Sequence, residues 1–513
     1  MNKNTRTYKA IKNAMISLIC EILYIVSRFV CRTVFTKILG AEYLGVNGLF
    51  TNILQLLSFV ELGMGSALIY MMYKPLAENN ENEILACVLF YKKIYRIISA
   101  FITLAGICVC PFIKYLVDAP EITENISLIY LLFLANTVTS YLFVAEKSIF
   151  SADQKDYVVS LFTQAFYIIM DVCQIIILIF TKNFYLYLAI GVVCNLLNNF
   201  MCSIYARKCY PFLRAKEKHF LPKETVDAFK NNVKGLFLTK IAATSFQGTD
   251  NIFISLFAGI SKVGIFSNYV LIVTIINNLL NKIFNSITPS IGNFSVSSTA
   301  SEKKVIFDRL YYTNTFLYRY ICLGLALFFT QFVTKIWLDE KFLLSEITIF
   351  LIVIELYLRG EHYIVNIFRN ANGDFSQLKS FYVIAAILNV LFDIILGKTL
   401  GLNGIIIATI VGRFICRIAD VIVVFKKELD IKPVRYFVKH YLFLFFYTVE
   451  FALFFLLFRF FSMTNVYIDF VLKIIIFSVL FVVIELIAFH KSQNQQFLLS
   501  VFRNIFRRKR NER

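Results

Sequence analysis

The sequence predicts an all-α polytopic membrane protein, and two observations carry this prediction. Hydrophobic residues make up 58% of the 513-residue chain, and they gather into apolar stretches that short polar segments separate. About fourteen of these stretches could cross a bilayer core of ~30 Å, which requires about 20 apolar residues per helix. Helices suit this solvent because they satisfy their backbone hydrogen bonds internally. Little sequence is left for a soluble domain.

The apolar stretches give the expected helices in chain order. The first six lie near 12–38, 43–73, 84–113, 124–146, 156–181 and 184–206. The others lie near 232–258, 263–291, 304–334, 343–368, 376–398, 402–426, 435–460 and 466–489. The first stretch is too long for the apolar region of a signal peptide, and it contains Glu21, Arg28 and Arg32. It is therefore expected to remain as the first helix.

The basic residues predict the orientation of the chain. The net charge is +19, and 24 lysines and arginines lie in four regions, 3–12, 207–234, 426–439 and 491–513. The loops on the other face hold six: Lys114, Lys182, Lys262, Lys335, Lys341 and Lys398. The positive-inside rule then puts both termini of this multi-pass protein in the cytoplasm. Because the charge follows the loops, no nucleic-acid partner is expected.

A repeat predicts two halves. Gly40 and Gly45 recur as Gly259 and Gly264, at a constant offset of 219, and the longest polar segment, 207–231, lies between the two pairs. Parallel repeats of this kind are typical of two-lobed transporters. We predict two pseudo-symmetric six-helix lobes plus two C-terminal helices. The boundaries are 1–206 and 232–428 for the lobes, 207–231 for a cytoplasmic linker, 429–489 for the last two helices and 490–513 for a tail.

The tail is predicted to be a basic amphipathic cytoplasmic segment. Its apolar residues repeat at helical spacing from Leu498 to Phe506, and a basic run follows over 507–510. Such a segment binds anionic phospholipid as an interfacial helix, or it is a solvated tail that follows the positive-inside rule. The sequence leaves both open.

Reactive groups are sparse, so we predict that the protein is not an enzyme. Three of the four histidines fall at or near cytoplasmic helix ends, and the eleven cysteines match no zinc or redox spacing. The longest outer loop, near 114–123, is too short for a soluble catalytic site. No catalytic residue, metal site or cofactor is expected.

Charged and amide side chains at membrane depth are the candidate binding residues. Each charge there costs about 2.5–3.5 kcal/mol on insertion scales, so it marks a functional candidate. The candidate substrate-binding residues are Arg28, Arg32, Lys240, Gln247 and Lys282. Arg28 and Arg32 lie too far along an outward-running helix to reach the cytoplasm, so they line a cavity or form a salt bridge within a lobe.

Three carboxylates at membrane depth are candidates for coupling to an ion. They are Glu61, Asp171 and Asp250. A carboxylate in a partly dry cavity can alternate between charged and neutral states as access to the cavity changes. The alternative is a permanent Lys240–Asp250 or Glu21–Lys240 bridge between the halves.

Other buried charges have structural explanations. Glu355 and Arg359 are spaced i, i+4 and are expected to pair with each other. Arg413 and Arg417 lie toward the cytoplasmic end of their helix and are expected to extend their charged groups to the membrane surface.

The strings VFTKILGAEYLGVNGLFTNILQLLSFVELGMGSALIYMMY (34–73), QGTDNIFISLFAGISKVGIFSNYVLIV (247–273) and LGLNGIIIATIVGRFICRI (400–418) resemble bacterial polysaccharide-transport proteins. These proteins belong to the multidrug/oligosaccharidyl-lipid/polysaccharide exporter superfamily and include O-antigen and capsule repeat-unit flippases. The resemblance implies a place in the bacterial inner membrane, two lobes around a central cationic cavity and transport by alternating access.

The same resemblance implies the cargo and partners. The cargo would be an undecaprenyl-pyrophosphate-linked oligosaccharide, moved from the inner to the outer leaflet for surface polysaccharide assembly. A sodium ion or proton would couple transport, and a polysaccharide polymerase and chain-length proteins would be partners. The alternatives are export of another lipid-linked anion, such as a teichoic acid or peptidoglycan precursor, a cation-coupled drug exporter, or a membrane oligosaccharide polymerase or ligase.

Overall fold

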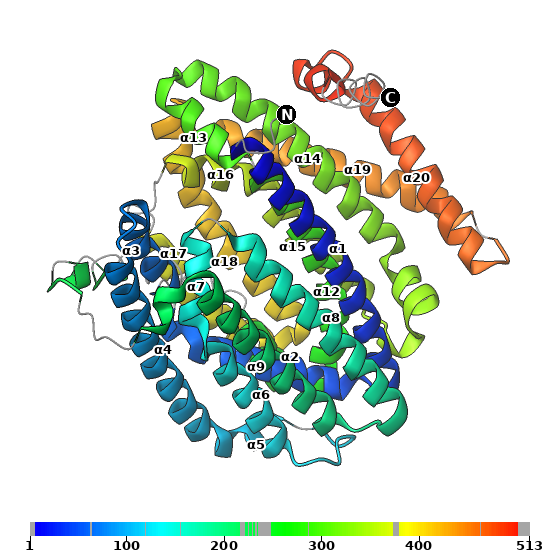
Figure 1. Ribbon diagram of the computed structural model, residues 1–513. Coiled ribbons are helices and arrows are strands. Elements are labelled where there is room, and N and C mark those ends of the chain that lie inside the picture. The colour runs from blue at the N-terminus through cyan, green and yellow to red at the C-terminus, as the bar shows by residue number, and fades with distance from the viewer. Residues whose placement is uncertain are drawn as a thin grey trace, which may run out of the picture. The chain divides into compact units, whose positions relative to one another are not determined.

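A computed structural model describes residues 6–500 except 62–63, 118, 154, 216–220, 224, 228, 231–232, 234–247, 286, 373–378 and 462 (Figure 1). The predicted all-α membrane fold is confirmed, since the described residues form helices and no strand. Within them, nine helices are long and apolar enough to cross a membrane, or ten if one bent pair forms a single span. Each predicted helical range contains described helix, and the count of fourteen spans stays a prediction.

The chain divides into two compact units, Met1–Gly264 and Ile265–Arg513. The predicted lobe boundaries stay a prediction. The helices of the first unit are α1 (Arg6–Leu39), α2 (Ala41–Leu57), α3 (Met64–Ala77), α4 (Glu81–Val109), α5 (Ile113–Leu116), α6 (Ile126–Tyr141), α7 (Val144–Ala152), α8 (Asp156–Thr181), α9 (Phe184–Cys209) and α11 (Asp250–Ala258).

The helix α12 (Ile260–Asn285) crosses the boundary between the units. The second unit continues with α13 (Thr288–Ser297), α14 (Ala300–Gln331), α15 (Glu346–Glu361), α16 (Tyr363–Asn372), α17 (Lys379–Leu400), α18 (Leu402–Val423), α19 (Val434–Arg459) and α20 (Val466–Ala488). Within the second unit, α14 packs against α15, α19 and α20.

Several helices that the sequence predicts as continuous are broken. The predicted helix 43–73 divides into α2 and α3, and 343–368 divides into α15 and α16. Between α6 and α7 the direction changes by 49°, and Phe143 takes a left-handed backbone with φ 63°. The predicted helix 263–291 divides into α12 and α13, and Pro289 lies in the first turn of α13, where a missing backbone N–H is tolerated. Hydropathy stays high across such breaks, so it does not reveal them.

The glycine repeat has a structural counterpart. Gly40 and Gly259 have φ of 90° and 88°, so both turns use a backbone conformation that favours glycine. A Cβ on Gly45 would lie 2.0 Å from the carbonyl oxygen of Ile260, and a Cβ on Gly264 would lie 1.8 Å from that of Ala41. The two contacts are related by the same offset of 219 residues, so the two turns pack against each other reciprocally.

Replacing Gly264 with alanine should therefore lower stability. The new methyl group would overlap backbone atoms that cannot move as a side chain does, at a cost of at least about 1–3 kcal/mol. Thermal unfolding of the purified protein should show a lower midpoint. Gly191→Ala is the matched control, because its Cβ would meet nothing closer than 3.6 Å. Equal midpoints for the two variants would contradict the close packing of the turns.

The start of the tail lies against the second unit. Residues 493–500 are helical, and Gln495 Nε2 donates to the Glu485 carbonyl oxygen at 2.8 Å. Arg309 lies over the Phe497 ring at 4.9 Å. Residues 501–513, which carry most of the predicted basic amphipathic segment, lie outside the described residues.

Candidate functional site

In the first unit, the polar face of α1 meets α8, which packs against α1 along its length (Figure 1). Arg28 Nη1 lies 2.9 Å from Asp171 Oδ1, and the Ser27 hydroxyl donates to Asp171 Oδ2 at 2.9 Å. Asp171 is fully buried, whereas 42% of the Arg28 side chain is exposed. The salt bridge within a lobe is therefore formed. This contact uses one guanidinium nitrogen, Nη1.

Further amides and aromatic groups surround this pair. Gln174, one turn along α8 from Asp171, donates to the Tyr187 carbonyl oxygen at 2.9 Å and accepts from the Cys31 thiol at 3.8 Å. Arg32 lies one turn beyond Arg28 on α1 and is half-buried. The structure thus joins the predicted residues Arg28 and Asp171 directly, with Arg32 on the adjacent turn.

Glu61 lies in a second polar cluster, at the break between α2 and α3. The Tyr95 hydroxyl donates to Glu61 Oε1 at 2.6 Å, and the Tyr91 and Tyr95 rings stack with centroids 4.6 Å apart. The structure does not place Glu61 beside Asp171 in any described contact. The two carboxylates therefore have separate surroundings within the first unit.

The remaining predicted residues divide between described and undescribed positions. Asp250 is half-buried in the first turn of α11, and Lys282 is exposed near the end of α12. Lys240 and Gln247 lie outside the described residues, as does the side chain of Glu21. The bridges predicted between Lys240 and a carboxylate stay predictions.

The sequence predicted only part of a cluster of charged residues in the second unit. Glu355 accepts from Arg359 Nη2 at 3.3 Å, which confirms the predicted pair, and its other oxygen lies 3.0 Å from Arg413 Nε. Two guanidinium groups therefore contact one half-buried carboxylate. The Tyr318 hydroxyl, on α14, donates to Asn277 Oδ1 at 3.1 Å. Only packing of α15 on α18 reveals that Arg413 belongs here.

The prediction for Arg417 is wrong. Its side chain is buried and pairs with Glu361, while its Nη2 donates to the Tyr436 hydroxyl at 2.8 Å. His440 Nδ1 lies 3.2 Å from the same Glu361 carboxylate. The Glu361 carboxylate neutralises the Arg417 charge inside the helix bundle, where a charge without a partner would be strongly destabilising.

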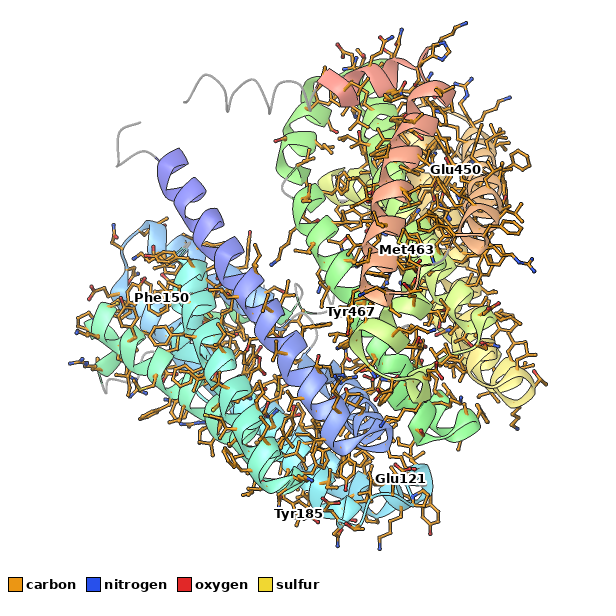
Figure 2. The ribbon with its side chains drawn as sticks, turned by 90° about the vertical axis from the view of Figure 1, so that its right-hand side faces the viewer. Glu121, Phe150, Tyr185, Glu450, Met463 and Tyr467 are labelled. Atoms are coloured by element: carbon orange, nitrogen blue, oxygen red, sulfur yellow. The ribbon has the colours of Figure 1, made fainter. Side chains whose placement is uncertain are left out.

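Arg319 is also buried and paired with carboxylates, in the interior of the second unit. The residue is 1% exposed, its Nε lies 3.0 Å from Glu450 Oε2, and its Nη2 contacts Glu485. The Tyr312 hydroxyl donates to Glu485 at 2.5 Å. This network ties α19 and α20 to α14, and Figure 2 shows Glu450 on its helix in this unit. It is a structural site.

Sequence reasoning missed several buried carboxylates, and Asp393 is one of them. Asp393 and Asn389, one turn apart on α17, are both fully buried, as is Asn268 on α12. The helix α17 packs extensively against α18. A carboxylate at 0% exposure in a membrane-spanning helix is a candidate for ion or proton binding. The i, i+4 spacing of Asn389 and Asp393 was the signal in the sequence that could have revealed it.

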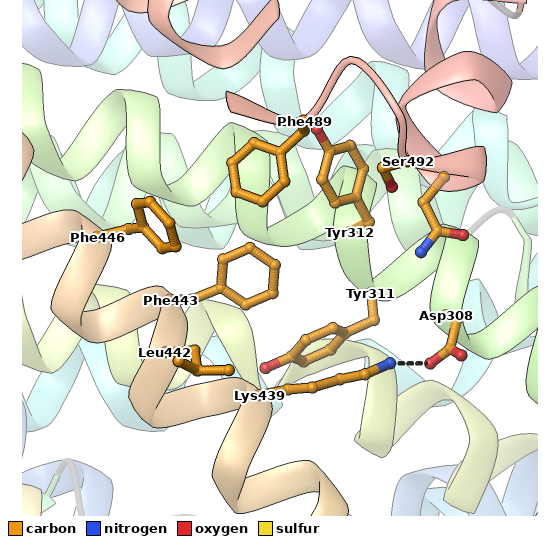
Figure 3. A pocket seen from close by; sticks show the side chains of 10 residues that line it. Asp308, Tyr311, Tyr312, Lys439, Leu442, Phe443, Phe446, Phe489 and Ser492 are labelled. Atoms are coloured by element: carbon orange, nitrogen blue, oxygen red, sulfur yellow. Dashed lines mark hydrogen bonds and ion pairs between the residues drawn. The ribbon is translucent and has the colours of Figure 1, made fainter. Parts of the chain in front are cut away.

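A small cavity of about 210 Å³ lies between α14, α19 and the end of α20. The Lys439 ammonium pairs with Asp308 at 2.7 Å at one edge, and aromatic rings face the space from several sides (Figure 3). Its charges are paired with each other. The cavity is also too small for a lipid-linked oligosaccharide, so it is not the candidate cargo site.

Comparisons with known proteins agree on fold and family. The model of a family described as polysaccharide biosynthesis protein matches residues 10–295. Comparison with curated protein sequences gives no match. The solved structure of the lipid II flippase MurJ, in an inward closed conformation, has a TM-score of 0.60 and 13% identity, and covers 94% of this chain and 99% of that chain.

Two other solved structures resemble the chain over less of its length. An inward-facing multidrug resistance MATE family transporter of the MOP superfamily has a TM-score of 0.60 and 13% identity, and covers 79% of this chain and 96% of that chain. A MOP superfamily transporter from Pyrococcus furiosus has a TM-score of 0.52 and 14% identity, and covers 80% of this chain and 92% of that chain. At these identities, the likeness concerns the fold.

Proposed function

Because the chain belongs to the polysaccharide biosynthesis protein family, we propose that it is a flippase for lipid-linked oligosaccharide. Its cargo is an undecaprenyl-pyrophosphate-linked repeat unit, which it moves from the inner to the outer leaflet by alternating access. The family match carries this proposal, and the fold shared with a lipid II flippase supports it. On this reading, the protein is a transporter and not an enzyme.

The charges in its helices suit such a cargo. The side chains of Arg28 in the first unit and of Arg359 and Arg413 in the second are 42%, 21% and 26% exposed. Guanidinium groups bind phosphate oxygens in bidentate fashion, and a pyrophosphate offers several such oxygens. Amide and hydroxyl side chains such as Asn277 on α12 and Ser27 on α1 suit sugar hydroxyls.

A peptidoglycan precursor is the second candidate cargo. The MurJ structure covers 94% of this chain, whereas the MATE transporter covers 79%. The longer match favours a lipid-linked cargo over a small drug. It does not distinguish one lipid-linked glycan from another, since the identity of 13% concerns the fold.

Reconstituted liposomes test the proposal. A fluorescent undecaprenyl-pyrophosphate oligosaccharide should be exposed to a membrane-impermeant quencher faster in vesicles with the protein than in empty vesicles. A lipid II analogue in parallel vesicles ranks the two cargoes. If both lipids remain as protected as in empty vesicles, the flippase function is wrong.

Ion coupling is tested in the same vesicles. Glu61, Asp171, Asp250 and Asp393 are the carboxylates that could bind sodium ions or protons during transport. Collapsing the sodium and proton gradients should slow flipping at least severalfold, and the Asp250→Asn and Asp393→Asn variants should lose the response to one gradient. Unchanged flipping by the wild-type protein without gradients, and by both variants, would exclude coupling.

We also propose that both termini lie in the cytoplasm, on the evidence of the basic regions. Cysteines introduced at Lys341 and Lys426, both exposed, report the two faces in a cysteine-free background. An impermeant maleimide applied to intact cells should label the first position, and the second only after permeabilisation. The opposite pattern would invert the topology.

A further inference from the structure

A second, larger cavity lies in the second unit, where two long helices begin. It has a volume of about 860 Å³ and lies between the first turns of α14 and α19 and the segment 429–432. Both α14 and α19 are long and apolar enough to cross a membrane. A cavity at the start of two spans lies at the level of the lipid headgroups, because spanning helices emerge from the hydrocarbon core there.

The cavity is basic, and within the part of the chain that the structure describes its lining holds more basic than acidic side chains. Lys304, Lys432 and Arg435 line it, against a single carboxylate from Asp430. The adjacent Lys303 pairs with Glu428 at 2.9 Å, whereas no ion pair within the described residues involves Lys304, Lys432 or Arg435. The lining therefore keeps a net positive charge.

Backbone N–H groups add to the positive charge that surrounds the cavity. Ala300 and Ser301 line the cavity and form the first turn of α14, where N–H groups lack partners within the helix. The N-terminal end of a helix carries a partial positive charge that favours anions. The Glu302 carboxylate, which could compete, is held by the backbone N–H of Thr299 at 2.8 Å and does not line the cavity.

An apolar strip leaves the cavity along α19. Val434 and Val438 line the cavity and are 67% and 53% exposed. Tyr441, Leu442 and Phe445 continue the same side of the helix and are also exposed. In a membrane-spanning helix, such a surface faces acyl chains. Phosphate-binding groups and a lipid-facing strip thus meet at one place.

We propose that this cavity binds an anionic phospholipid of the bilayer, with the headgroup phosphate on Lys304, Lys432 and Arg435 and the acyl chains along Val434, Val438 and Leu442. The charge of the lining selects an anionic headgroup, and the strip selects a lipid over a soluble phosphate. The site is built within the second unit and does not depend on the nature of the transported cargo.

Native mass spectrometry of the purified protein tests the site, with phosphatidylglycerol and phosphatidylcholine as probes. The triple variant Lys304→Gln, Lys432→Gln and Arg435→Gln should bind phosphatidylglycerol at least about tenfold more weakly, since each basic residue at a membrane surface contributes roughly fivefold. Phosphatidylcholine binding should not change. A control triple variant, Lys262→Gln, Lys341→Gln and Lys398→Gln, removes the same charge from exposed positions elsewhere and should retain wild-type affinity.

Asp430→Asn provides a test in the opposite direction. Asp430 has φ 50°, a conformation that asparagine tolerates, so the variant removes only the opposing charge. It should bind phosphatidylglycerol severalfold more tightly than the wild-type protein. Equal affinities for both triple variants, or displacement of the lipid by millimolar inorganic phosphate alone, would overturn the proposal.

Discussion

Replacing Arg319 with methionine should destabilise the protein by about 3–5 kcal/mol, the usual cost of removing one partner from a buried ion pair. Methionine fills similar space but leaves Glu450 and Glu485 with no cation between them. Both carboxylates are buried, so neither gains hydration in exchange. Thermal unfolding in detergent should show a much lower midpoint, and little folded protein should accumulate in membranes.

Matched variants separate the loss of charge balance from the loss of packing. Adding Glu450→Gln and Glu485→Gln to Arg319→Met removes the two carboxylate charges that have lost their cation. This triple variant should recover a large part of the lost free energy of unfolding. Arg459→Met alters an exposed arginine at the end of α19 and should have little effect. A triple variant no more stable than Arg319→Met would show that shape, and not charge, governs this site.

Replacing Arg28 with alanine should reduce flipping of lipid-linked oligosaccharide by about ten- to a hundredfold, if its exposed fork binds phosphate. A hydrogen bond to a charged group contributes about 1.5–3 kcal/mol, and two such bonds are accessible to a bidentate guanidinium. Lysine at this position should restore only part of the rate, because its point charge cannot bind in that way. The measurement is the initial rate in liposomes, normalised to folded protein.

A double variant distinguishes cargo binding from a structural salt bridge. Asp171 is fully buried, so Arg28→Ala alone removes its ion-pair partner, and the resulting loss of folded protein would lower flipping just as a binding defect does. Arg28→Gln combined with Asp171→Asn keeps a neutral hydrogen-bonded pair. If Arg28 binds cargo, this double variant stays slow although it is folded. Wild-type flipping by the double variant would assign the pair a structural role alone.

The sequence by itself determined that the protein is a membrane protein and where most of its helices lie. Hydropathy is a local property, so runs such as 156–181 and 466–489 predicted α8 and α20 almost to the residue. The Gly-x4-Gly repeat was also readable, since the φ of about 90° at Gly40 and Gly259 is a backbone conformation that favours glycine. The Glu355–Arg359 pair followed from its i, i+4 spacing within one helix.

Only the tertiary structure decided where helices break and which partner neutralises each buried charge. Arg28 and Asp171 are 143 residues apart, and Arg319 and Glu485 are 166 apart. Spacing along a helix shows which face a charge occupies, but not which helix packs against that face. An ion pair in a low-dielectric interior depends on contact at about 3 Å, and that distance is set by packing between helices distant in the sequence.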